Sequence, residues 1–340
     1  MAYSTINKST LHFSPTLYVG NGSTKTVTGI PFEPDMTWIK NRSATGDNEI
    51  YDKLRGVGYR IYPNTSAGQD DLGSQGLTAW TSDGFTVGNN NAINGNGNNL
   101  VSWNWKAGTT SGISAGSQTI TPTSYSINTT AGFGIYKWSR TGASTTDYFS
   151  HGLGATPTIA IQKKTDGVQG WYVNYTFVDG TMDYMNLNNT NSKFDGTTTV
   201  PTSTNYYPKS PETGDYITYL FTPIQGFSKF GSYTGNGNAD GSFIYTGFKP
   251  ALFLLKESNG TNSWQIFDNK RPGYNLTDKY LKPNENASEV SGNNQIDILS
   301  NGVKLRSSNT GNNGSGQNFI YMAFAEAPLV GSNNVPANAR

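Results

Sequence analysis

The sequence Y-V-G-N-G at Tyr18–Gly22 is followed by T-G-I-P-F-E-P-D-M-T-W-I-K at Thr28–Lys40. The same pair returns later in the chain as Y-T-G-N-G at Tyr233–Gly237 and T-G-F-K-P-A-L-F-L-L-K at Thr246–Lys256. A more divergent third copy ends in H-G-L-G-A-T-P-T-I-A-I-Q-K at His151–Lys163. In each copy a lysine lies six positions after a proline. A repeat of this length predicts three similar modules in series.

Outside these motifs, the first and last copies share a pair of charged residues. Asp52 and Arg55 follow Pro34 by 18 and 21 positions, and Asp268 and Arg271 follow Pro250 by the same spacings. A residue repeated at one spacing in two modules is more typical of a structural role than of a catalytic pair in a single cleft. We therefore expect each aspartate to pair with its arginine or to cap a short turn.

The composition indicates β structure. The chain has 40 glycines, much Asn, Ser and Thr, and 13 % aromatic residues, a mixture typical of strands joined by tight turns. Val101, Trp103 and Trp105 alternate with polar residues, as in a half-buried strand. We predict an all-β fold of three tandem β-sandwich modules, lectin-like or jelly-roll-like, with G-N-G hairpin turns and single helical turns near Tyr51–Arg55 and Asn269–Tyr274. The side chains expected to be buried are Trp38, Ile39, Trp103, Leu254, Trp264 and Phe324.

Module boundaries follow from the repeat and from composition. The predicted segments are an N-terminal arm (1–16), module one (17–107), a Thr/Ser/Gly-rich linker (108–130), module two (131–225), module three (226–328) and a C-terminal tail (329–340). Because terminal segments without a strand pattern are disordered unless something holds them in place, we expect a homo-oligomer, a trimer, held partly by these two ends.

Charge and residue inventory argue against several function classes. The net charge is +1 and only 14 % of residues are charged, so steering toward nucleic acid or an anionic membrane is not expected. Cysteine is absent, which excludes disulfides and thiolate metal sites. The two histidines, His12 and His151, are too few for a His-rich metal site, and His151 is interpreted as a turn residue. We expect no enzyme activity, no cofactor, no nucleic-acid partner and no membrane insertion.

Acidic residues leave two alternatives open. Glycosidases need only a pair of carboxylates, so a polysaccharide depolymerase stays among the hypotheses. Loop oxygens could also ligate calcium, but none of the acidic loops has an ordered ligand spacing; they carry Asp47, Asp70, Asp71 and Asp240.

Aromatic residues of the divergent middle module are the candidate binding residues. Sugars stack their C–H faces on aromatic rings, and loops on a rigid scaffold often carry such residues. Core packing is the competing interpretation for each ring. The glycan-binding candidates are Trp138, Tyr148, Phe149, Tyr206 and Tyr207.

The stretch G-F-S-K-F-G-S-Y-T-G-N-G-N-A-D-G-S-F-I-Y-T-G-F-K-P at Gly226–Pro250 resembles a family of phage virion proteins common in marine and cyanobacterial phages. The opening at Tyr18–Arg42 and the ending F-I-Y-M-A-F-A-E-A-P-L-V-G-S-N-N-V-P at Phe319–Pro336 are similar to that family as well. The resemblance implies a non-enzymatic virion component, usually a tail fibre or receptor-binding protein, with lectin-like β-sandwich domains.

Three hypotheses follow. The first is a virion tail fibre or appendage, made in the bacterial host cytoplasm and placed on the virion surface, that binds a host surface polysaccharide. The second is a capsid or tail decoration protein that contacts only other virion proteins. The third is the depolymerase.

Overall fold

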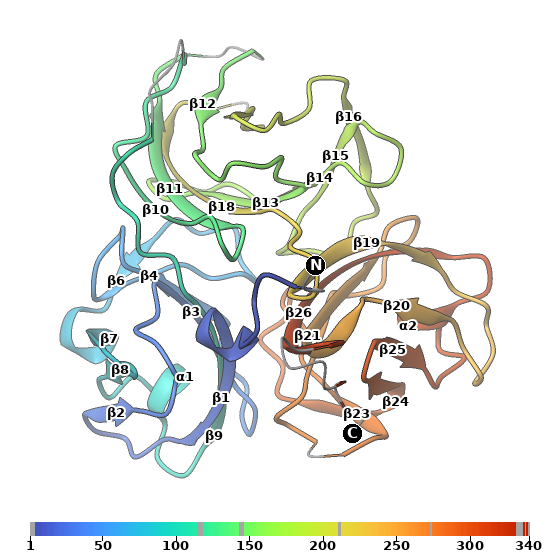
Figure 1. Cartoon of the computed structure of the whole chain (residues 1–340). Coiled ribbons are helices and arrows are strands. Elements are labelled where there is room, and N and C mark those ends of the chain that lie inside the picture. The colour runs from blue at the N-terminus through green and yellow to red at the C-terminus, as the bar shows by residue number, and fades with distance from the viewer. Residues whose placement is uncertain are drawn as a thin grey trace.

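The structure, a computed structural model, describes residues 4–113, 118–142, 146–209, 212–272, 274–330, 336 and 338. Over these residues, strands form antiparallel sheets, and the helices are single turns at Ser9–Leu11, Gly73–Gln75, Asn91–Asn94 and Thr310–Asn313. The strands fall into three lobes around a common centre (Figure 1). The prediction of an all-β fold of β-sandwich modules is confirmed.

Lobe 1 places a four-stranded inner sheet toward the centre of the molecule and a three-stranded sheet outside it. The strand order is β1-β9-β3-β4 in the inner sheet and β2-β8-β7 in the outer sheet. A short β5–β6 pair lies between β4 and β7 in the sequence. The bounds are β1 Phe13–Val19, β2 Lys25–Val27, β3 Met36–Asn41, β4 Glu49–Asp52, β5 Tyr59–Arg60, β6 Asp70–Asp71, β7 Leu77–Thr81, β8 Gly84–Val87 and β9 Asn99–Trp105.

Lobe 3 repeats this topology. Its inner order, β19-β26-β21-β22, matches β1-β9-β3-β4, and its outer sheet has the order β20-β25-β24-β23. The bounds are β19 Ser228–Thr234, β20 Phe243–Tyr245, β21 Phe248–Glu257, β22 Gln265–Asp268, β23 Thr277–Tyr280, β24 Val290–Leu299, β25 Gly302–Leu305 and β26 Asn318–Pro328.

Lobe 2 keeps the inner sheet but extends it on both sides. The order β11-β18-β13-β14 matches the other two lobes, with β10 added at one edge and β15–β16 at the other, and its outer layer is only the pair β12–β17. The bounds are β10 Ser124–Asn128, β11 Phe133–Arg140, β12 Phe149–Ser150, β13 Ile159–Lys164, β14 Tyr172–Tyr175, β15 Met182–Met185, β16 Phe194–Thr197, β17 Asn205–Tyr206 and β18 Gly214–Phe221.

Two of the segments predicted to lie outside the modules contribute strands to them. Strand β1 begins at Phe13, inside the predicted arm, and pairs with β9, whereas β10 lies inside the predicted linker and pairs with β11. The arm is also fixed by its own chain, since Ile6 is buried in the shared core and the Ser4 hydroxyl donates to the Gln225 carbonyl oxygen at 2.9 Å. A partner chain is therefore not needed to order the arm.

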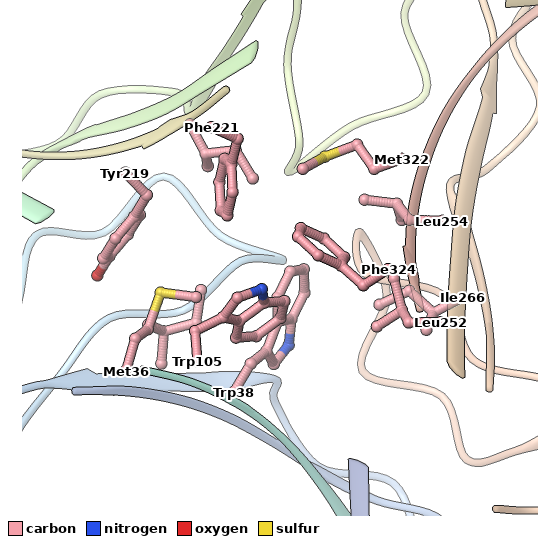
Figure 2. A pocket seen from close by; sticks show the side chains of 12 residues that line it. Met36, Trp38, Trp105, Tyr219, Phe221, Leu252, Leu254, Ile266, Met322 and Phe324 are labelled. Atoms are coloured by element: carbon pink, nitrogen blue, oxygen red, sulfur yellow. The ribbon is translucent and has the colours of Figure 1, made fainter. Parts of the chain in front are cut away.

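The three inner sheets enclose one hydrophobic core, and equivalent aromatic residues meet at its centre (Figure 2). Trp105, Phe221 and Phe324 occupy matching register positions on β9, β18 and β26, opposite Met36, Ile159 and Leu252. Their ring centroids lie 6.5, 5.7 and 5.7 Å apart, in the pairs Trp105–Phe221, Trp105–Phe324 and Phe221–Phe324. The apolar cavity that remains between the sheets is only about 20 Å³, so the centre is a packed core of pseudo-threefold symmetry.

Polar contacts between lobes follow the same symmetry and are of two kinds. Side chains at equivalent positions each donate to a backbone oxygen of the next lobe: Asn48 to Glu285 at 2.9 Å, Trp171 to Tyr62 at 2.8 Å and Trp264 to Asn186 at 2.9 Å. Three backbone hydrogen bonds run in the opposite sense: Glu289 to Arg42, Gln69 to Thr165 and Lys193 to Ser258. Two more, Gly46 to Asn286 and Gln169 to Ser66, run in the same sense as the side-chain bonds. Each lobe is thus bonded to both of its neighbours, and the three lobes form a closed ring.

The six side chains predicted to be buried are all buried, but the G-N-G motifs are not hairpin turns. Each motif leads from the inner to the outer sheet and packs on a one-turn helix, α1 (Asn91–Asn94) or α2 (Thr310–Asn313). The Gly20 and Gly22 amides donate to Asn98 and Asn94 oxygens. A Cβ on Gly20 would lie 2.2 Å from the Gly95 oxygen, so close backbone approach requires glycine there.

Candidate functional site

Three of the five predicted glycan-binding residues belong to a core. Trp138, Phe149 and Tyr206 are buried, with Phe149 packed against the other two rings at centroid distances of 6.1 and 5.4 Å. Phe149 and Tyr206 are opposite each other in the β12–β17 pair. Because this outer layer is so small, its inward side chains must be large to cover the inner sheet. The prediction that these three rings contact a glycan is therefore wrong.

The other two candidates lie at the surface and contact each other. Tyr148 and Tyr207 are half-buried, and their ring centroids are 5.5 Å apart. Each is the neighbour in sequence of a buried strand residue, and alternation along a strand turns it to the opposite face. The structure therefore brings one pair of the predicted residues together as a partly exposed aromatic pair.

A polar pocket of about 270 Å³ lies next to this pair. The Tyr148 amide donates to the Thr119 hydroxyl at 2.8 Å, which joins the ring pair to the pocket wall. Arg140 and Asp147 form an ion pair in the pocket with a 3.2 Å contact, and the Ser139 hydroxyl donates to Asp215. The pocket is lined by Thr119, Ile120, Ser139, Arg140, Thr141, Gly142 and Asp147. Hydroxyl, guanidinium and carboxylate groups beside aromatic rings are suited to a polyhydroxylated ligand.

The β14–β15–β16 extension carries an aromatic cluster that the sequence analysis did not single out. Tyr172 and Tyr184 have ring centroids 5.3 Å apart, and Tyr184 stacks on Phe194 at 4.8 Å. The Lys209 ammonium lies 4.0 Å from the Tyr184 ring centroid, a cation–π contact. The Tyr184 ring thus contacts both Phe194 and Lys209, which makes it a weaker platform for a ligand than Tyr148 and Tyr207. In the sequence, this cluster could have been found from the aromatic residues that recur in successive short strands of the middle module.

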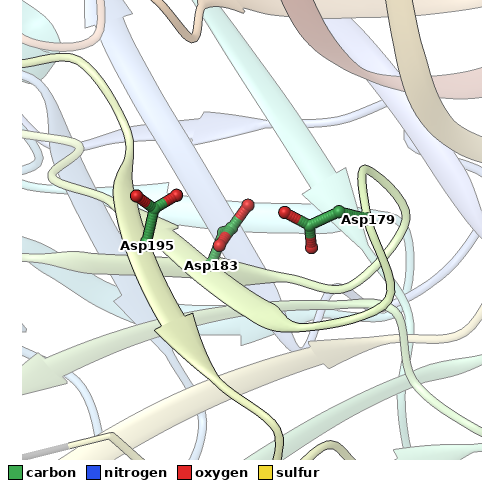
Figure 3. A group of neighbouring side chains, drawn as sticks. All are labelled: Asp179, Asp183 and Asp195. Atoms are coloured by element: carbon green, nitrogen blue, oxygen red, sulfur yellow. The ribbon is translucent and has the colours of Figure 1, made fainter.

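An acidic cluster lies on the same extension (Figure 3). Carboxylate oxygens of Asp179, Asp183 and Asp195 lie within 4.8 Å of one another. The Lys193 ammonium is 3.2 Å from Asp183, 2.5 Å from Asp195 and 3.7 Å from Asp179. The lysine occupies the space between the carboxylates and offsets one of their three negative charges, so a divalent cation would have to displace it. Asp183 also accepts from the Gly196 amide, which indicates a structural role in the hairpin.

The aspartates considered for calcium in the sequence make other contacts. Asp70 pairs with Arg60 at 3.0 Å and Asp240 with Lys304 at 2.8 Å. Asp47 accepts from the Asn64 amide, and Asp71 accepts from the Gly73 amide. Asp70 and Asp71 are both in β6, but each of the four aspartates has its own partner, so these contacts do not form one ligand set.

The predicted Asp–Arg pairs are present in lobes 1 and 3. The Arg55 Nε donates to Asp52 at 2.6 Å, and the Arg271 Nε donates to Asp268 at 2.6 Å, with all four side chains buried. Each aspartate also accepts from the backbone amide of its arginine at 3.0 Å, so it caps the turn as well. Burial raises the pKa of Asp268, but the charge and hydrogen bonds of Arg271 and the backbone amides of Lys270 and Arg271 together outweigh it, so the pKa is lowered overall.

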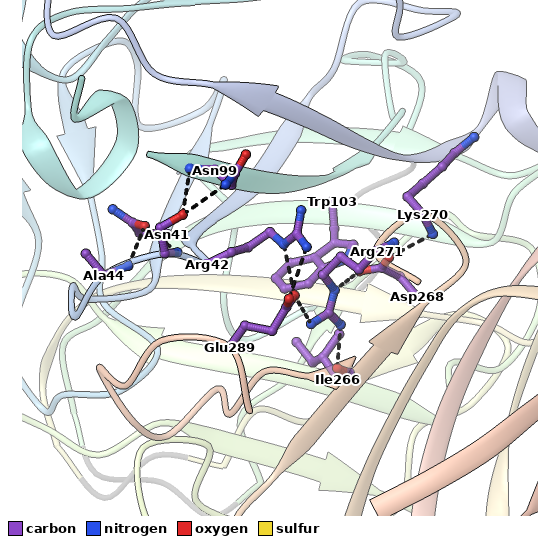
Figure 4. Close-up of polar contacts among 11 residues, drawn as sticks. Asn41, Arg42, Ala44, Asn99, Trp103, Ile266, Asp268, Lys270, Arg271 and Glu289 are labelled. Carbon is purple, nitrogen blue, oxygen red and sulfur yellow. Dashed lines mark hydrogen bonds and ion pairs between the residues drawn. The ribbon is translucent and has the colours of Figure 1, made fainter. Parts of the chain in front are cut away.

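These pairs also connect the lobes. Asp52 accepts from the Tyr219 hydroxyl of lobe 2 at 2.8 Å, and Asp268 accepts from the Trp103 indole of lobe 1 at 3.1 Å. Lobes 1 and 3 are further joined by Glu289, which contacts both Arg42 and Arg271 (Figure 4). At the position equivalent to Asp52 and Asp268, lobe 2 has Tyr175.

The repeated lysines are structural as well. Lys40, Lys163 and Lys256 are buried, and each ammonium donates to backbone carbonyl oxygens. Those acceptors include Asn286 for Lys40 and Ser66 for Lys163, each on a neighbouring lobe. Burial lowers the pKa of all three lysines to about 8.

The histidines are placed as packing and turn residues. His151 is buried, its Nε2 lies 3.1 Å from the Thr202 carbonyl oxygen, and its Nδ1 accepts from the Leu153 amide. His12 packs edge-on against Phe227 with ring centroids 5.8 Å apart. Burial lowers the pKa of both rings.

Within the part of the chain that the structure describes, no helix has the length and apolar character needed to span a membrane. Comparison with curated proteins and with solved structures found no match. The family described as a domain of unknown function (DUF7483) matches residues 8–328, which include all three lobes. The chain therefore belongs to the DUF7483 family.

Proposed function

We propose that this chain is a non-enzymatic phage virion protein, part of a tail fibre or appendage, that binds a saccharide on the host surface through lobe 2. The observation that carries the proposal is the half-buried Tyr148–Tyr207 ring pair beside a polar pocket of about 270 Å³. A second polar pocket, of about 460 Å³ in lobe 1, has no aromatic residue in its lining, which is Gly22, Ser23, Thr24, Ser74, Gln75, Gly88 and Asn89.

In this proposal each part of the site has a separate task. The Tyr148 and Tyr207 rings offer apolar surface to the C–H face of a sugar ring. Arg140 and Asp147 are already paired with each other, so they can exchange hydrogen bonds with sugar hydroxyls without an unpaired charge. Stacking of this kind gives weak affinity at one site, and several copies on a particle would multiply it.

A virion location is supported by the motif resemblance and by the architecture. The three lobes pack around one core, so none of them is a separate domain on a flexible linker. This compact arrangement, which contains no cysteine and needs no disulfide, suits a protein that stays outside a cell. In this proposal other virion proteins are partners, and the chain is made in the bacterial host before assembly. The expected trimer stays a prediction, and the packing of the arm on its own chain removes one argument for it.

The test is binding of the labelled chain to an array of bacterial surface polysaccharides. The double variant Tyr148→Ala/Tyr207→Ala should lose binding while keeping its thermal unfolding midpoint within a few degrees of the unmodified chain. The matched control is Tyr274→Ala, the same substitution at a tyrosine that is 82 % exposed in lobe 3. It should bind normally.

Other outcomes would favour the other hypotheses. Undiminished binding by the double variant would remove this site. Absence of binding to every polysaccharide would favour a decoration protein with only virion contacts. Release of oligosaccharides by the unmodified chain would establish a depolymerase.

A further inference from the structure

The outer sheet of lobe 3 exposes two aromatic rings on one face. Phe243 is 45 % exposed and Tyr245 is 48 % exposed, whereas Ile244 between them is buried. The three residues make up β20, an edge strand paired with β25. The Phe243 ring lies over Gly302 of β25, because a Cβ on that glycine would be only 2.9 Å from it. The two rings therefore stand on the solvent face of the sheet.

The equivalent face of lobe 1 shows that the fold does not need these rings. Val27 faces Phe85 across β2–β8, as Ile244 faces Val303 across β20–β25. The residues that flank Val27 are Thr26 and Thr28, and both are exposed. Threonine is a good strand residue, so lobe 1 builds the same strand without aromatic side chains. Two apolar rings kept in water on this face of lobe 3, where lobe 1 has threonine, indicate an interaction surface.

The charged groups around these rings are largely balanced. Asp240 pairs with Lys304 at 2.8 Å, and Asp297 pairs with Arg306 at 2.6 Å. The Lys229 ammonium lies 5.1 Å from the Tyr245 ring centroid and donates to the Tyr245 carbonyl oxygen at 2.7 Å. Lys229 is on β19, the edge strand of the inner sheet, where a lysine hinders pairing with another strand. The face thus offers ring surface and paired polar groups, and it has no strong charge with which to attract an ionic partner.

From this geometry we propose that the outer face of lobe 3 is a second saccharide-binding surface, and that its ligand is a neutral polysaccharide. Phe243 and Tyr245 are two residues apart on one strand face, about 6.5–7 Å along the strand. Neighbouring sugar units of one chain could therefore each meet a ring, while the Lys304–Asp240 and Arg306–Asp297 pairs meet hydroxyls. The proposal depends on lobe 3 only, and it would stand if the Tyr148–Tyr207 site were inactive.

Native affinity electrophoresis tests it, with dextran, mannan or galactomannan in the gel as neutral probes and alginate as the acidic one. The full chain should be retarded by at least one neutral polymer. The variant Phe243→Thr/Tyr245→Thr gives lobe 3 the residues of lobe 1, so it should fold. We expect its apparent affinity to fall by about tenfold or more, the change that about 1.4 kcal/mol produces. The Tyr148→Ala/Tyr207→Ala variant should keep the retardation by that polymer.

The reciprocal variant is a stricter test. Thr26→Phe/Thr28→Tyr places the two rings on the matching face of lobe 1 and should increase retardation by the same polymer. The proposal is overturned if no neutral polymer retards the chain, if alginate alone does, or if the lobe 3 double variant is retarded as strongly as the unmodified chain. It is also overturned if that variant converts a dimer into a monomer in light scattering, because the face would then be a contact between two copies.

Discussion

The inner sheets of the three lobes have stayed alike, whereas their outer layers have diverged. All three inner sheets share one order of four strands, which lobe 2 extends at both edges, and equivalent residues of each contact the next lobe. The outer layers have three, two and four strands, and matched positions carry Thr26 in lobe 1 but Phe243 in lobe 3. Contacts between lobes restrict change in the inner sheets. The outer layers, which contact solvent, are free to acquire binding residues.

The largest expected difference in stability is between removing an aromatic ring from the shared core and removing one from an outer sheet. Phe324→Ala removes one of the three rings at the centre and should lower the free energy of unfolding by about 3–5 kcal/mol. Phe243→Ala removes an exposed ring and should change it by no more than about 0.5 kcal/mol. Urea unfolding followed by tryptophan fluorescence measures both values.

The same experiment tests whether the core is shared. Because Phe324 contacts rings from both other lobes, its loss should shift one common transition. Two separate unfolding transitions, with that of lobe 1 unaffected by Phe324→Ala, would show that the lobes unfold independently. Contacts between lobes would then not be what keeps the inner sheets alike.

A smaller effect should distinguish the two buried Asp–Arg pairs. Asp52→Asn leaves Arg55 buried, and the other acceptors of its guanidinium include the backbone oxygens of Tyr59 and Ile50. We expect a loss of stability of about 3–5 kcal/mol, as for a buried pair that loses one partner. Asp268→Asn should cost less by about 1.5 kcal/mol, because Arg271 keeps Glu289 at 3.3 Å.

Thermal and urea unfolding of the two variants measure the difference, and binding to polysaccharide should be unchanged in both. Asp240→Asn is the control, since its ion pair is exposed to solvent and its loss should leave stability almost unchanged. Loss of a hydrolytic activity in Asp52→Asn without loss of stability would contradict the structural role.

The smallest effect, taken for one residue over one pH unit, concerns the repeated lysines. Their pKa of about 8 in the folded chain lies below the ordinary value of 10.5, so above pH 8 the unfolded chain binds more protons than the folded one. Stability should therefore rise with pH from about 8 to 9.5, by at most about 1.4 kcal/mol per pH unit for each lysine. Above pH 10 the raised pKa values of buried tyrosines, such as Tyr18 and Tyr51, oppose this rise.

Urea unfolding at several pH values checks the slope, and Lys256→Met should remove about one third of it. A stability that falls between pH 8 and 9.5 would mean that the hydrogen bonds to carbonyl oxygens keep these lysines charged in the folded chain.

The sequence predicted the parts of this fold that depend on repetition. The spacing of the Asp–Arg pairs and the alternation around Trp103 identified two alike modules and their buried residues. Closure of the ring was not predictable in this way, because Trp105, Phe221 and Phe324 have the same pattern as any inward strand residue. The rings that they contact are on other lobes, about a hundred residues or more away in the sequence. Periodicity describes only neighbouring residues of one strand, so it does not predict such contacts.

The candidate site was predicted only in part for a related reason. Neighbouring residues in Tyr148–Phe149 and in Tyr206–Tyr207 point to opposite faces, and composition does not say which faces outward. The structure turns Phe149 and Tyr206 inward because the small outer layer of lobe 2 must cover the inner sheet. Only the two remaining tyrosines reach the surface.

The contacts of lobe 1 with lobe 3 have a consequence for how the chain is made. Lys40 and Asn48 bond to Asn286 and Glu285, more than two hundred residues later in the sequence. During translation, the inner face of lobe 1 therefore stays uncovered until lobe 3 has been made. The core is complete only when β26 has left the ribosome, because Phe324 of β26 packs against Trp105. Until then Trp105 and its neighbours are exposed apolar surface, so translation that terminates early, within lobe 3, would release a chain prone to aggregate.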